Sequence, residues 1–391
     1  MDLDALGTSP IGSLIPISGF DRRFDRDYNY FAYEPIPLPD SLVLDNDTIF
    51  EMSAADRALG NLNSRIRFLP NPDLLVRPVL AAEARATSAI EGTFATLDEI
   101  LAAEFGDPTR SIEMREIRNY ISAANQGLQL IQSLPISRRM LEQLHAILVY
   151  GTRGDSYDAG SLRQKQVFIG AEGAPVEEAR FVPVPNGSRL EEGFSSWERW
   201  VNDEQRIPLL AKVALTHYQF ETLHPFSDGN GRLGRLIITL QLVIAGELAH
   251  PVLNLSAWFE PRKPEYIEAL MNVSVSGNFD SWIQIFCRAV AARAEAAMAV
   301  IDSMFSYRDE IVATALDRGY RGIRGDVADF VIGNPVFTVA ELRESLGVAT
   351  NTAARRIQDL EAIGVVREIT GSSYGRLYFA QRVSRLLEER N

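Results

Sequence analysis

The segment HPFSDGNGRLGR, residues 224–235, constrains the fold more than any other part of this chain. It contains three glycines, and apolar residues recur at helical spacing both before it, over residues 190–223, and after it, over residues 232–248. A tight turn must therefore join two helices here, because glycine adopts backbone angles that other residues avoid. Helical spacing also covers residues 54–104, 113–150 and 266–297, so the sequence predicts a mainly α-helical chain.

Two stretches depart from the helical pattern. VFIG and RFVPV, between Gly160 and Pro185, are short β-prone runs around a loop that contains glycine and proline. This pattern predicts a β-hairpin flap on an otherwise helical domain. Residues 1–40 are rich in proline and aromatic residues, and they predict an extended arm, since each proline biases the residue before it away from helical angles.

The C-terminal part of the sequence predicts a separate small domain. FTVAELRESLGVATNTAARRIQDLEAIGVVREI is typical of a helix, a turn at Gly347–Thr350, a second helix that starts at Asn351, and a strand. TGSSYGRLYFA follows as a return strand, which completes a winged helix-turn-helix pattern. We therefore expect three domains, namely an N-terminal arm with helices over 1–105, a main helical domain over 106–322 and the winged helix over 323–391.

Composition excludes several functional classes. A net charge of -13 over 391 residues argues against a chain that coats nucleic acid or anionic membranes through its overall charge. The single cysteine, Cys287, excludes an intramolecular disulfide, and its apolar neighbours predict a core position. There is no secretion signal and no apolar run long enough for a membrane span, so we expect a soluble, cytoplasmic protein.

Two interpretations of residues 224–235 can be set aside. Gly229, Gly231 and Gly234 satisfy G-x-G-x-x-G, but that pattern indicates a dinucleotide site only when it follows a strand, and a helix precedes it here. A histidine metal site is also disfavoured, because the four histidines include no pair at ligand spacing; His145 and His217 are expected to be partly buried helix residues.

An anion-binding loop accounts for all the residue types in the segment. Gly229 and Gly231 allow backbone angles that turn N–H groups inward, and a helix that begins near Asn230 points its positive end at the same place. Arg232 and Arg235 lie three positions apart, on one side of that helix, where each can pair with phosphate oxygens.

The remaining polar residues of the segment supply reaction chemistry. Asp228 suits Mg²⁺ that bridges two phosphates, because this ion prefers carboxylate and phosphate oxygens. His224 titrates near neutral pH and can take a proton from an attacking hydroxyl, while Phe226 is expected to point into the core. The segment therefore predicts a phosphoryl- or nucleotidyl-transfer site.

The complete pattern H-x-F-x-D-G-N-G-R-x-x-R resembles the active-site signature of Fic-domain proteins. The helices before residue 105 and the hairpin resemble that family's N-terminal extension and target-docking flap. The resemblance implies transfer of AMP from ATP to a hydroxyl of a target protein, with release of pyrophosphate.

The same resemblance implies a role for each residue of the pattern. His224 would be the general base and Asp228 would hold Mg²⁺. The loop Gly229, Asn230 and Gly231 would bind the α- and β-phosphates, Arg232 the β-phosphate and Arg235 the γ-phosphate. Tyr266 would line the adenine pocket.

TSAIEG, residues 87–92, matches the family's inhibitory motif [ST]-x-x-x-E-[GN]. Thr87 and Glu91 are four positions apart on one helical face, and Gly92 can end that helix. The resemblance implies that Glu91 pairs with Arg235 and prevents ATP from settling in a reactive pose. We therefore expect an autoinhibited enzyme.

The hairpin and the C-terminal domain supply the expected partner sites. Exposed strand edges at Val167, Phe168, Ile169, Phe181 and Val182 would pair with an extended target segment. The winged helix would bind DNA or a protein, since its eight arginines and seven acidic residues from Phe337 onward nearly balance.

Several alternatives stay open at this point. The chain could instead remove AMP, with Glu91 orienting a water molecule, or it could be a transcriptional regulator that senses nucleotide through the Fic domain. The hydroxyl-rich TGSSYG, residues 370–375, offers a site for self-modification. A homodimer is one option for assembly.

Overall fold

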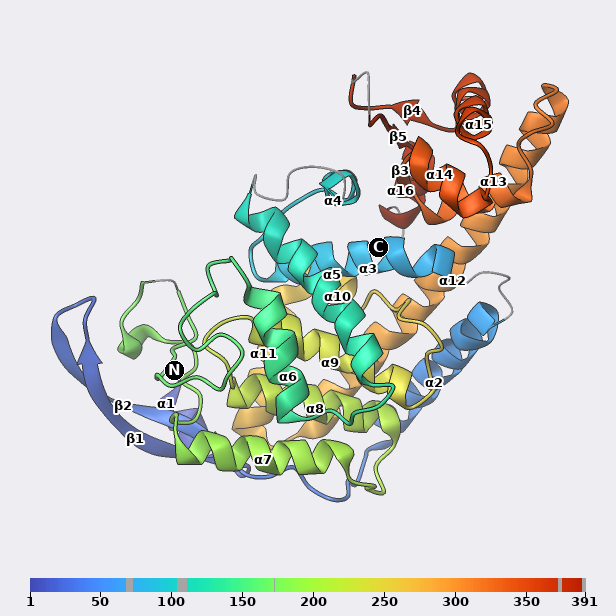
Figure 1. The fold of residues 1–391 in the computed structure, drawn as a ribbon. Coiled ribbons are helices and arrows are strands. Elements are labelled where there is room, and N and C mark those ends of the chain that lie inside the picture. The colour runs from blue at the N-terminus through green and yellow to red at the C-terminus, as the bar shows by residue number, and fades with distance from the viewer. Residues whose placement is uncertain (68–72, 104–110, 172, 372–374, 389–391) are drawn as a thin grey trace. The chain divides into compact units, whose positions relative to one another are not determined.

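The computed structural model describes residues 1–67, 73–103, 111–171, 173–371 and 375–388 (Figure 1). It divides into two compact units, each assembled from separate segments of the chain. The first unit comprises residues 1–56, 122–245 and 261–289, and the second comprises residues 57–121, 246–260 and 290–391. The expected boundaries at residues 105 and 322 do not coincide with the boundaries of these units.

The first unit contains most of the helices around the glycine-rich segment. Its elements are α1 (Leu3–Gly7), β1 (Gly12–Asp21), β2 (Arg26–Pro35), α6 (Arg138–Val149), η1 (Val176–Glu178), α7 (Ser188–Asn202), α8 (Leu209–Leu223), α9 (Asn230–Ile244) and α11 (Lys263–Ser276). Elements that belong to both units are α2 (Asn46–Arg67), α5 (Ile112–Leu130), η2 (Glu260–Arg262) and α12 (Phe279–Asp317).

Helix α8 forms the centre of the first unit. Its sequence is apolar on nearly every side, as expected of a helix surrounded by others, and it packs against α7 and α9. The indole N–H of Trp197 donates to the carbonyl oxygen of Thr216, and that of Trp282 donates to the carbonyl oxygen of Ala214. Gly234 lets α9 approach closely, because a Cβ there would lie 2.5 Å from Oε1 of Glu221 on α8. Cys287 is buried, as predicted.

The expected N-terminal arm is extended, but it folds into a β-hairpin, which the sequence analysis missed. Ten-residue strands β1 and β2 pair antiparallel from Gly12 opposite Pro35 to Asp21 opposite Arg26. The connection at residues 22–25 lacks the Asn-Gly or Asp-Gly signal of a tight hairpin turn, and Asp25 itself adopts a positive φ of 50°. Tyr33 and Ala32 of β2 are buried in the unit.

The expected flap hairpin is reduced to a single antiparallel bridge. Ile169 and Phe181 exchange backbone hydrogen bonds of 2.9 and 3.0 Å, and η1 forms part of the connection between them. The expectation of an exposed edge at Phe181 and Val182 is wrong, because both side chains are buried and the Val182 carbonyl accepts a hydrogen bond from Tyr33 of β2. Val167, Phe168 and Ile169 are partly exposed.

The second unit is built around α3. Its elements are α3 (Asp73–Ile90), α4 (Leu97–Ala103), α10 (Ser256–Phe259), α13 (Gly325–Gly333), β3 (Val336–Thr338), α14 (Val339–Leu346), α15 (Thr350–Ala362), β4 (Arg367–Glu368), β5 (Leu377–Phe379) and α16 (Gln381–Glu388). Helix α3 packs against α10, α13, α4 and α16. Glu83 of α3 is buried and accepts a hydrogen bond from the backbone N–H of Ser256 at 3.0 Å.

The C-terminal elements follow the predicted order of helix, turn, helix and two strands. Thr338 and Glu341 form a capping box at the start of α14, and Gly347 ends that helix with a φ of 61°. Helix α15 begins at Thr350, one residue before the predicted Asn351. The strands form a sheet in the order β3-β5-β4. Residues 372–374 of the TGSSYG segment lie outside the described residues.

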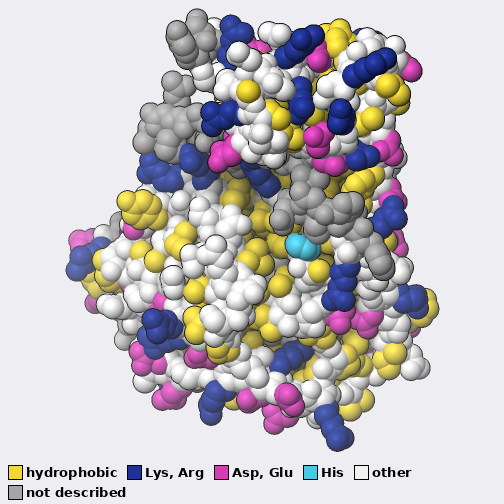
Figure 2. Space-filling view, turned by 45° about the vertical axis from the view of Figure 1, so that its right-hand side comes forward, with side chains coloured by type: hydrophobic (Ala, Val, Ile, Leu, Met, Phe, Trp, Pro, Cys, Tyr) yellow, Lys and Arg dark blue, Asp and Glu magenta, His cyan; other side chains and the backbone are white. Residues whose placement is uncertain are grey.

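Charges of both signs are mixed on the surface of this C-terminal part. In Figure 2 the dark blue Lys and Arg side chains at the top of the molecule, where Figure 1 shows α14 and α15, are interspersed with magenta Asp and Glu side chains. The face in view carries no large area of one sign. Among the described helices, none has the length and apolar character that a membrane crossing requires.

Candidate functional site

His224 is held in an uncommon backbone conformation at the end of α8. It caps that helix with φ 48° and ψ 62°, and its N–H donates to the carbonyl oxygen of Phe220 at 2.9 Å. A residue other than glycine in the left-handed region indicates local strain, which is common at functional sites. Nδ1 lies 3.4 Å from the carbonyl oxygen of Glu221, a contact that favours the tautomer with hydrogen on Nδ1 and the lone pair on Nε2.

The loop after His224 is closed by Asn230. Its side-chain amide donates to the carbonyl oxygen of Phe226 at 2.8 Å, and its Oδ1 accepts from the Phe226 N–H at 2.9 Å. Phe226 is fully buried, as predicted. The Asn230 side chain is therefore engaged within the loop, so any contact of this residue with phosphate would come from the backbone at the start of α9.

Gly229 provides the turn that begins α9. It adopts φ 76° at the N-cap position, and a Cβ there would lie 3.3 Å from both Leu148 and Val149. The first amides of α9 consequently face the loop, as the anion-binding prediction requires. Glycine is needed both for the positive φ and for the close packing.

Two arginines from the first turns of α9 lie beneath this loop. Arg232 and Arg235 are each only 3% exposed, and Nη2 of Arg232 lies 3.8 Å from Oδ1 of Asp228. Buried guanidinium groups are costly unless anionic groups compensate them. Both arginines lie in the first turns of α9, so their positive charge adds to that of the helix end, and the combination favours an anion.

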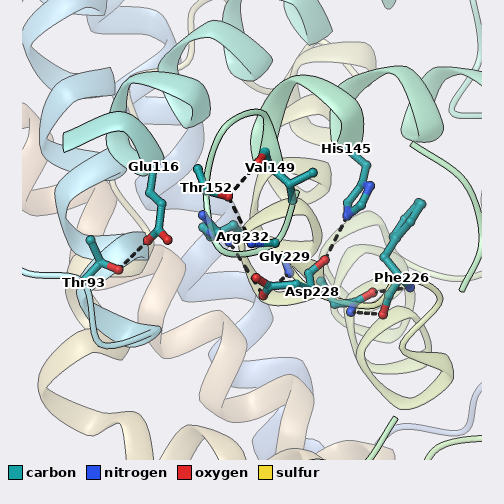
Figure 3. Close-up of polar contacts among 11 residues, drawn as sticks. Thr93, Glu116, His145, Val149, Thr152, Phe226, Asp228, Gly229 and Arg232 are labelled. Atoms are coloured by element: carbon teal, nitrogen blue, oxygen red, sulfur yellow. Dashed lines mark hydrogen bonds and ion pairs between the residues drawn. The ribbon is translucent and has the colours of Figure 1, made fainter. Parts of the chain in front are cut away.

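Asp228 presents an oxygen ligand at the mouth of the loop. Its side chain is half exposed, and its Oδ1 accepts a hydrogen bond of 2.6 Å from the Gly229 N–H (Figure 3). No group of three or more His, Cys, Asp or Glu side chains suited to a metal occurs among the residues described. One half-exposed carboxylate fits Mg²⁺, which takes one or two protein carboxylates and fills its shell with phosphate and water oxygens.

His145 of α6 supports the same loop, a contact that sequence reasoning missed. Its Nδ1 accepts from the Gly160 N–H at 2.9 Å, so Nε2 carries the proton and donates to the carbonyl oxygen of Asp228 at 2.9 Å. The ring stacks on Phe226 with centroids 4.1 Å apart, and Figure 3 shows it pointing toward the Asp228 backbone. Burial lowers the pKa of His145, which keeps the ring neutral.

Asp158 and Arg163 hold the other side of the loop. Oδ2 of Asp158 accepts from the Ser227 hydroxyl at 2.7 Å. Arg163 is buried, its Nε donates to the carbonyl oxygen of His224 at 2.9 Å, and its backbone N–H donates to that of Pro225. The sequence spacing of these two residues did not indicate a role for either one. Arg163 contacts a backbone oxygen 61 positions away, and Asp158 contacts a serine 69 positions away.

His217 and Tyr266 form a buried pair below α9. Nε2 of His217 lies 2.6 Å from the Tyr266 hydroxyl, and both rings lie near Trp282. Burial, with a further contribution from Arg235, lowers the pKa of His217 to about 3. Tyr266 is only 4% exposed, so in this structure its ring belongs to the core and does not line an open adenine pocket.

The predicted inhibitory motif lies in the second unit, at the end of α3. Thr87 is fully buried within the helix, whereas Glu91 is exposed and follows its last residue, Ile90. Gly92 ends the helix with φ 92°, which confirms the sequence prediction.

Backbone hydrogen bonds fix the position of Glu91. The N–H of Gly92 donates to the carbonyl oxygen of Ala89, and the N–H of Thr93 donates to that of Ser88. This is a Schellman motif with Gly92 in the left-handed position. The Thr93 hydroxyl further donates to Glu116 of α5 at 2.5 Å, as the dashed line in Figure 3 indicates.

The structure thus brings His224, Asp228, Gly229, Arg232 and Arg235 together around one loop of the first unit. Glu91 belongs to the second unit, and its pairing with Arg235 stays a prediction. A histidine, a carboxylate, helix amides and two buried arginines at one loop are the residue types of a phosphate-handling transferase site in a helical protein.

Comparison with known proteins places this site in a family. Residues 135–242 match the model of the Fic/DOC family, and residues 49–129 match that of the Fic/DOC family N-terminal region. Residues 49–129 and 135–242 of the chain are therefore similar to Fic/DOC family proteins. A Fic family protein from Desulfovibrio desulfuricans G20 has a similar fold, with a TM-score of 0.56 at 18% identity over 88% of this chain and 98% of that one.

Curated relatives are similar in sequence to part of this chain. Protein adenylyltransferase fic-1 of Caenorhabditis elegans is 28% identical over 55% of this chain and 43% of its own length. Protein adenylyltransferase Fic of Drosophila grimshawi is 33% identical over 32% of this chain and 23% of its own. The chain thus spans less than half of the length of these relatives.

Proposed function

We propose that this chain is an autoinhibited protein adenylyltransferase that moves AMP from ATP to a Ser, Thr or Tyr hydroxyl of a target protein. The observation that carries the proposal is the strained His224 directly before a loop of helix amides, with Asp228 and two buried arginines around the same loop. The Fic/DOC match over residues 135–242 and the names of the curated relatives support the same activity.

The transfer step uses His224 as the general base. The acceptor hydroxyl oxygen forms a bond to the α-phosphorus of ATP while its proton moves to Nε2 of His224. The bond from the α-phosphorus to the bridging oxygen breaks, and pyrophosphate leaves with that electron pair. The contact of Nδ1 with the Glu221 carbonyl supports this role, because it favours the lone pair on Nε2.

The remaining residues of the loop bind and orient the triphosphate. The loop Gly229, Asn230 and Gly231 would bind the α- and β-phosphates through backbone N–H groups at the start of α9, while Arg232 would bind the β-phosphate and Arg235 the γ-phosphate. Asp228 would hold Mg²⁺, which neutralises phosphate charge when it is bound. The contacts of His145, Asp158 and Arg163 keep the loop in place before ATP arrives, which limits the reorganisation that the reaction requires.

The proposed inhibition acts through Glu91. Its carboxylate follows the C-terminal end of α3, where the helix dipole disfavours negative charge by about 0.3–1 kcal/mol. A pairing with the Arg235 guanidinium would offset this cost and take Arg235 from the γ-phosphate. ATP would then bind in a pose from which in-line attack is slow.

A pyrophosphate-release assay tests the activity and the switch together. Purified wild-type chain and Glu91→Gly are incubated with ATP, Mg²⁺ and a cell extract that supplies targets. We expect little pyrophosphate from the wild type and a strong increase with Glu91→Gly. Equal rates would refute the switch. If the chain instead removes AMP, a pre-adenylylated extract should lose AMP on incubation with wild type but not with Glu91→Gly.

The C-terminal elements are proposed to form a winged helix that binds a partner. The order α14, α15, β4 and β5 supports a winged helix, and the mixed charges in Figure 2 favour a protein partner over DNA. A gel-shift assay of the full chain at low salt with random-sequence duplex separates the two. Salt-sensitive binding of duplex would contradict a protein partner and support the regulator alternative.

A further inference from the structure

A groove of about 940 Å³ lies within the first unit, between the N-terminal hairpin and the flap segment. One wall comes from β1 and the turn at its end, and includes Ile17, Phe20 and Arg22. The opposite wall comes from residues 165–168 and the loop that follows them. The groove extends to Ser227, the residue before Asp228. A chain lying in it would therefore lead directly to the catalytic loop.

The charged residues of this groove are mainly basic. Among the described residues that line it, Arg22, Arg23 and Lys165 are basic and Asp21 is acidic. Arg23 donates to both carboxylate oxygens of Asp21, at 3.0 and 2.6 Å, so these two charges compensate each other.

Arg22 and Lys165 consequently dominate the charge of the groove. Both are exposed, and within the described ranges no carboxylate lies within 4.0 Å of either one. Because the chain as a whole carries a net charge of -13, this local positive charge selects for an anionic ligand that the remaining surface would repel.

The groove also offers apolar contacts. Phe20 lines the groove and is 53% exposed, so its ring is accessible to a ligand. Phe168 packs edge-on against Tyr28 with ring centroids 5.5 Å apart, so the hairpin and the flap meet through aromatic contact at the groove. A ligand that fills the groove would carry apolar or aromatic side chains beside its acidic ones.

We propose that this groove receives an extended, acidic segment of the target protein, with an apolar or aromatic residue that contacts Phe20. The inference rests on the proposed adenylyltransferase activity, since a docked target would present a hydroxyl beside the loop that contains His224. The N-terminal hairpin is then part of substrate recognition. Basic targets are excluded by charge, whereas main-chain pairing at the flap alone would not depend on target sequence.

A binding experiment without ATP or Mg²⁺ tests this proposal independently of catalysis. Two fluorescein-labelled peptides of equal length each contain Phe, Ser and Tyr; one carries Asp and Glu at positions where the other carries Lys and Arg. Fluorescence anisotropy measures their affinity for the full chain. We expect the acidic peptide to bind at least about tenfold more tightly, and its affinity to fall with added salt.

Matched charge reversals locate the binding surface. Arg22→Glu with Lys165→Glu should weaken the acidic peptide by about tenfold or more. Arg199→Glu with Arg206→Glu makes the same change in charge at exposed sites of α7 and the loop after it, and should retain the affinity. Thermal melts confirm that both double variants are folded.

Three outcomes would overturn the proposal. These are equal affinity for the two peptides, equal loss in the two double variants, and competitive displacement of the acidic peptide by ATP, which would assign the groove to nucleotide. Selective binding of the acidic peptide together with no AMP transfer by Glu91→Gly would refute the proposed function and leave the docking groove standing. AMP transfer without selective peptide binding would refute the docking groove and leave the proposed function standing.

Discussion

The Nε2 atom of His145 lies 2.9 Å from the carbonyl oxygen of Asp228, and this contact connects α6 to the backbone of the residue that we propose to hold Mg²⁺ (Figure 3). The imidazole is oriented from both ends, because its Nδ1 accepts from Gly160 while one ring face stacks on Phe226. His145 therefore acts as a positioning residue that sets the direction of the Asp228 side chain.

Replacing His145 with phenylalanine separates its packing from its hydrogen bonds. His145→Phe keeps an aromatic ring against Phe226 but releases the Asp228 carbonyl. In the Glu91→Gly background we expect AMP transfer to fall by about 10- to 100-fold, because small misplacements of reacting groups cost rates of this order. The Mg²⁺ concentration for half-maximal rate should rise as well, which a general loss of folding would not produce. His250→Phe in the second unit is the control, and equal rates in the two variants would contradict the assignment.

Gly154 lies so close to the Asp228 carboxylate that a side chain there would have to displace it. A Cβ at Gly154 would lie 2.5 Å from Oδ2 of Asp228. In the Glu91→Gly background, Gly154→Ala should therefore displace the carboxylate and reduce AMP transfer at least about tenfold. Gly60→Ala, where nothing lies within 4 Å, is the control; it should leave the rate unchanged and raise stability by up to about 1 kcal/mol, since Gly60 is inside α2. Unchanged activity of Gly154→Ala would remove Asp228 from the site.

Gly92 holds Glu91 at the end of α3 through its positive φ of 92°. Alanine is disfavoured there by about 1–2 kcal/mol, so Gly92→Ala should loosen the turn and partly relieve inhibition. The expected result is a lower melting temperature together with faster AMP transfer than wild type. Gly364→Ala has a comparable φ of 77° and equally open surroundings, so it should lower stability without activating. Activation by both variants would show that destabilisation alone relieves the inhibition.

The buried His217 should make the stability of the folded chain sensitive to acid. Its pKa is about 3 in the folded chain and near 6.5 in the unfolded chain. At pH values between these two, the imidazole is protonated in the unfolded chain but neutral in the folded chain. Stability from this group is present above about pH 6.5 and is lost as pH falls toward 3. Chemical denaturation at pH 7, 6 and 5 should show a smaller pH dependence for His217→Gln than for wild type. An identical slope would contradict the buried neutral histidine.

The helical framework and the central loop could be predicted from sequence because both depend on local chemistry. The glycines of the loop at 229–231 act over a few residues. The turn at Gly92 follows the same rule. The position of Phe226 in the core also follows from an apolar residue between polar ones in a tight turn.

The supporting contacts could not be predicted, because they join residues distant in sequence through backbone atoms. Arg163 contacts the carbonyl of His224, and His145 contacts that of Asp228, so neither pair leaves a side-chain pattern. The hairpin at residues 12–35 was missed because its turn lacks the usual signal. Burial of Phe181, Val182 and Tyr266 depends on elements that pack over them, which spacing along the chain does not reveal.

The central claim is AMP transfer by His224, and the position of a radioactive label in ATP tests it most directly. Glu91→Gly and the double variant Glu91→Gly with His224→Ala are incubated with Mg²⁺, cell extract and ATP labelled on either the α- or the γ-phosphate. The account predicts that, above the label that extract alone gives with each ATP, Glu91→Gly labels protein from α-labelled ATP only, and that the double variant adds none. Label from γ-labelled ATP, or undiminished α-label without His224, would contradict it.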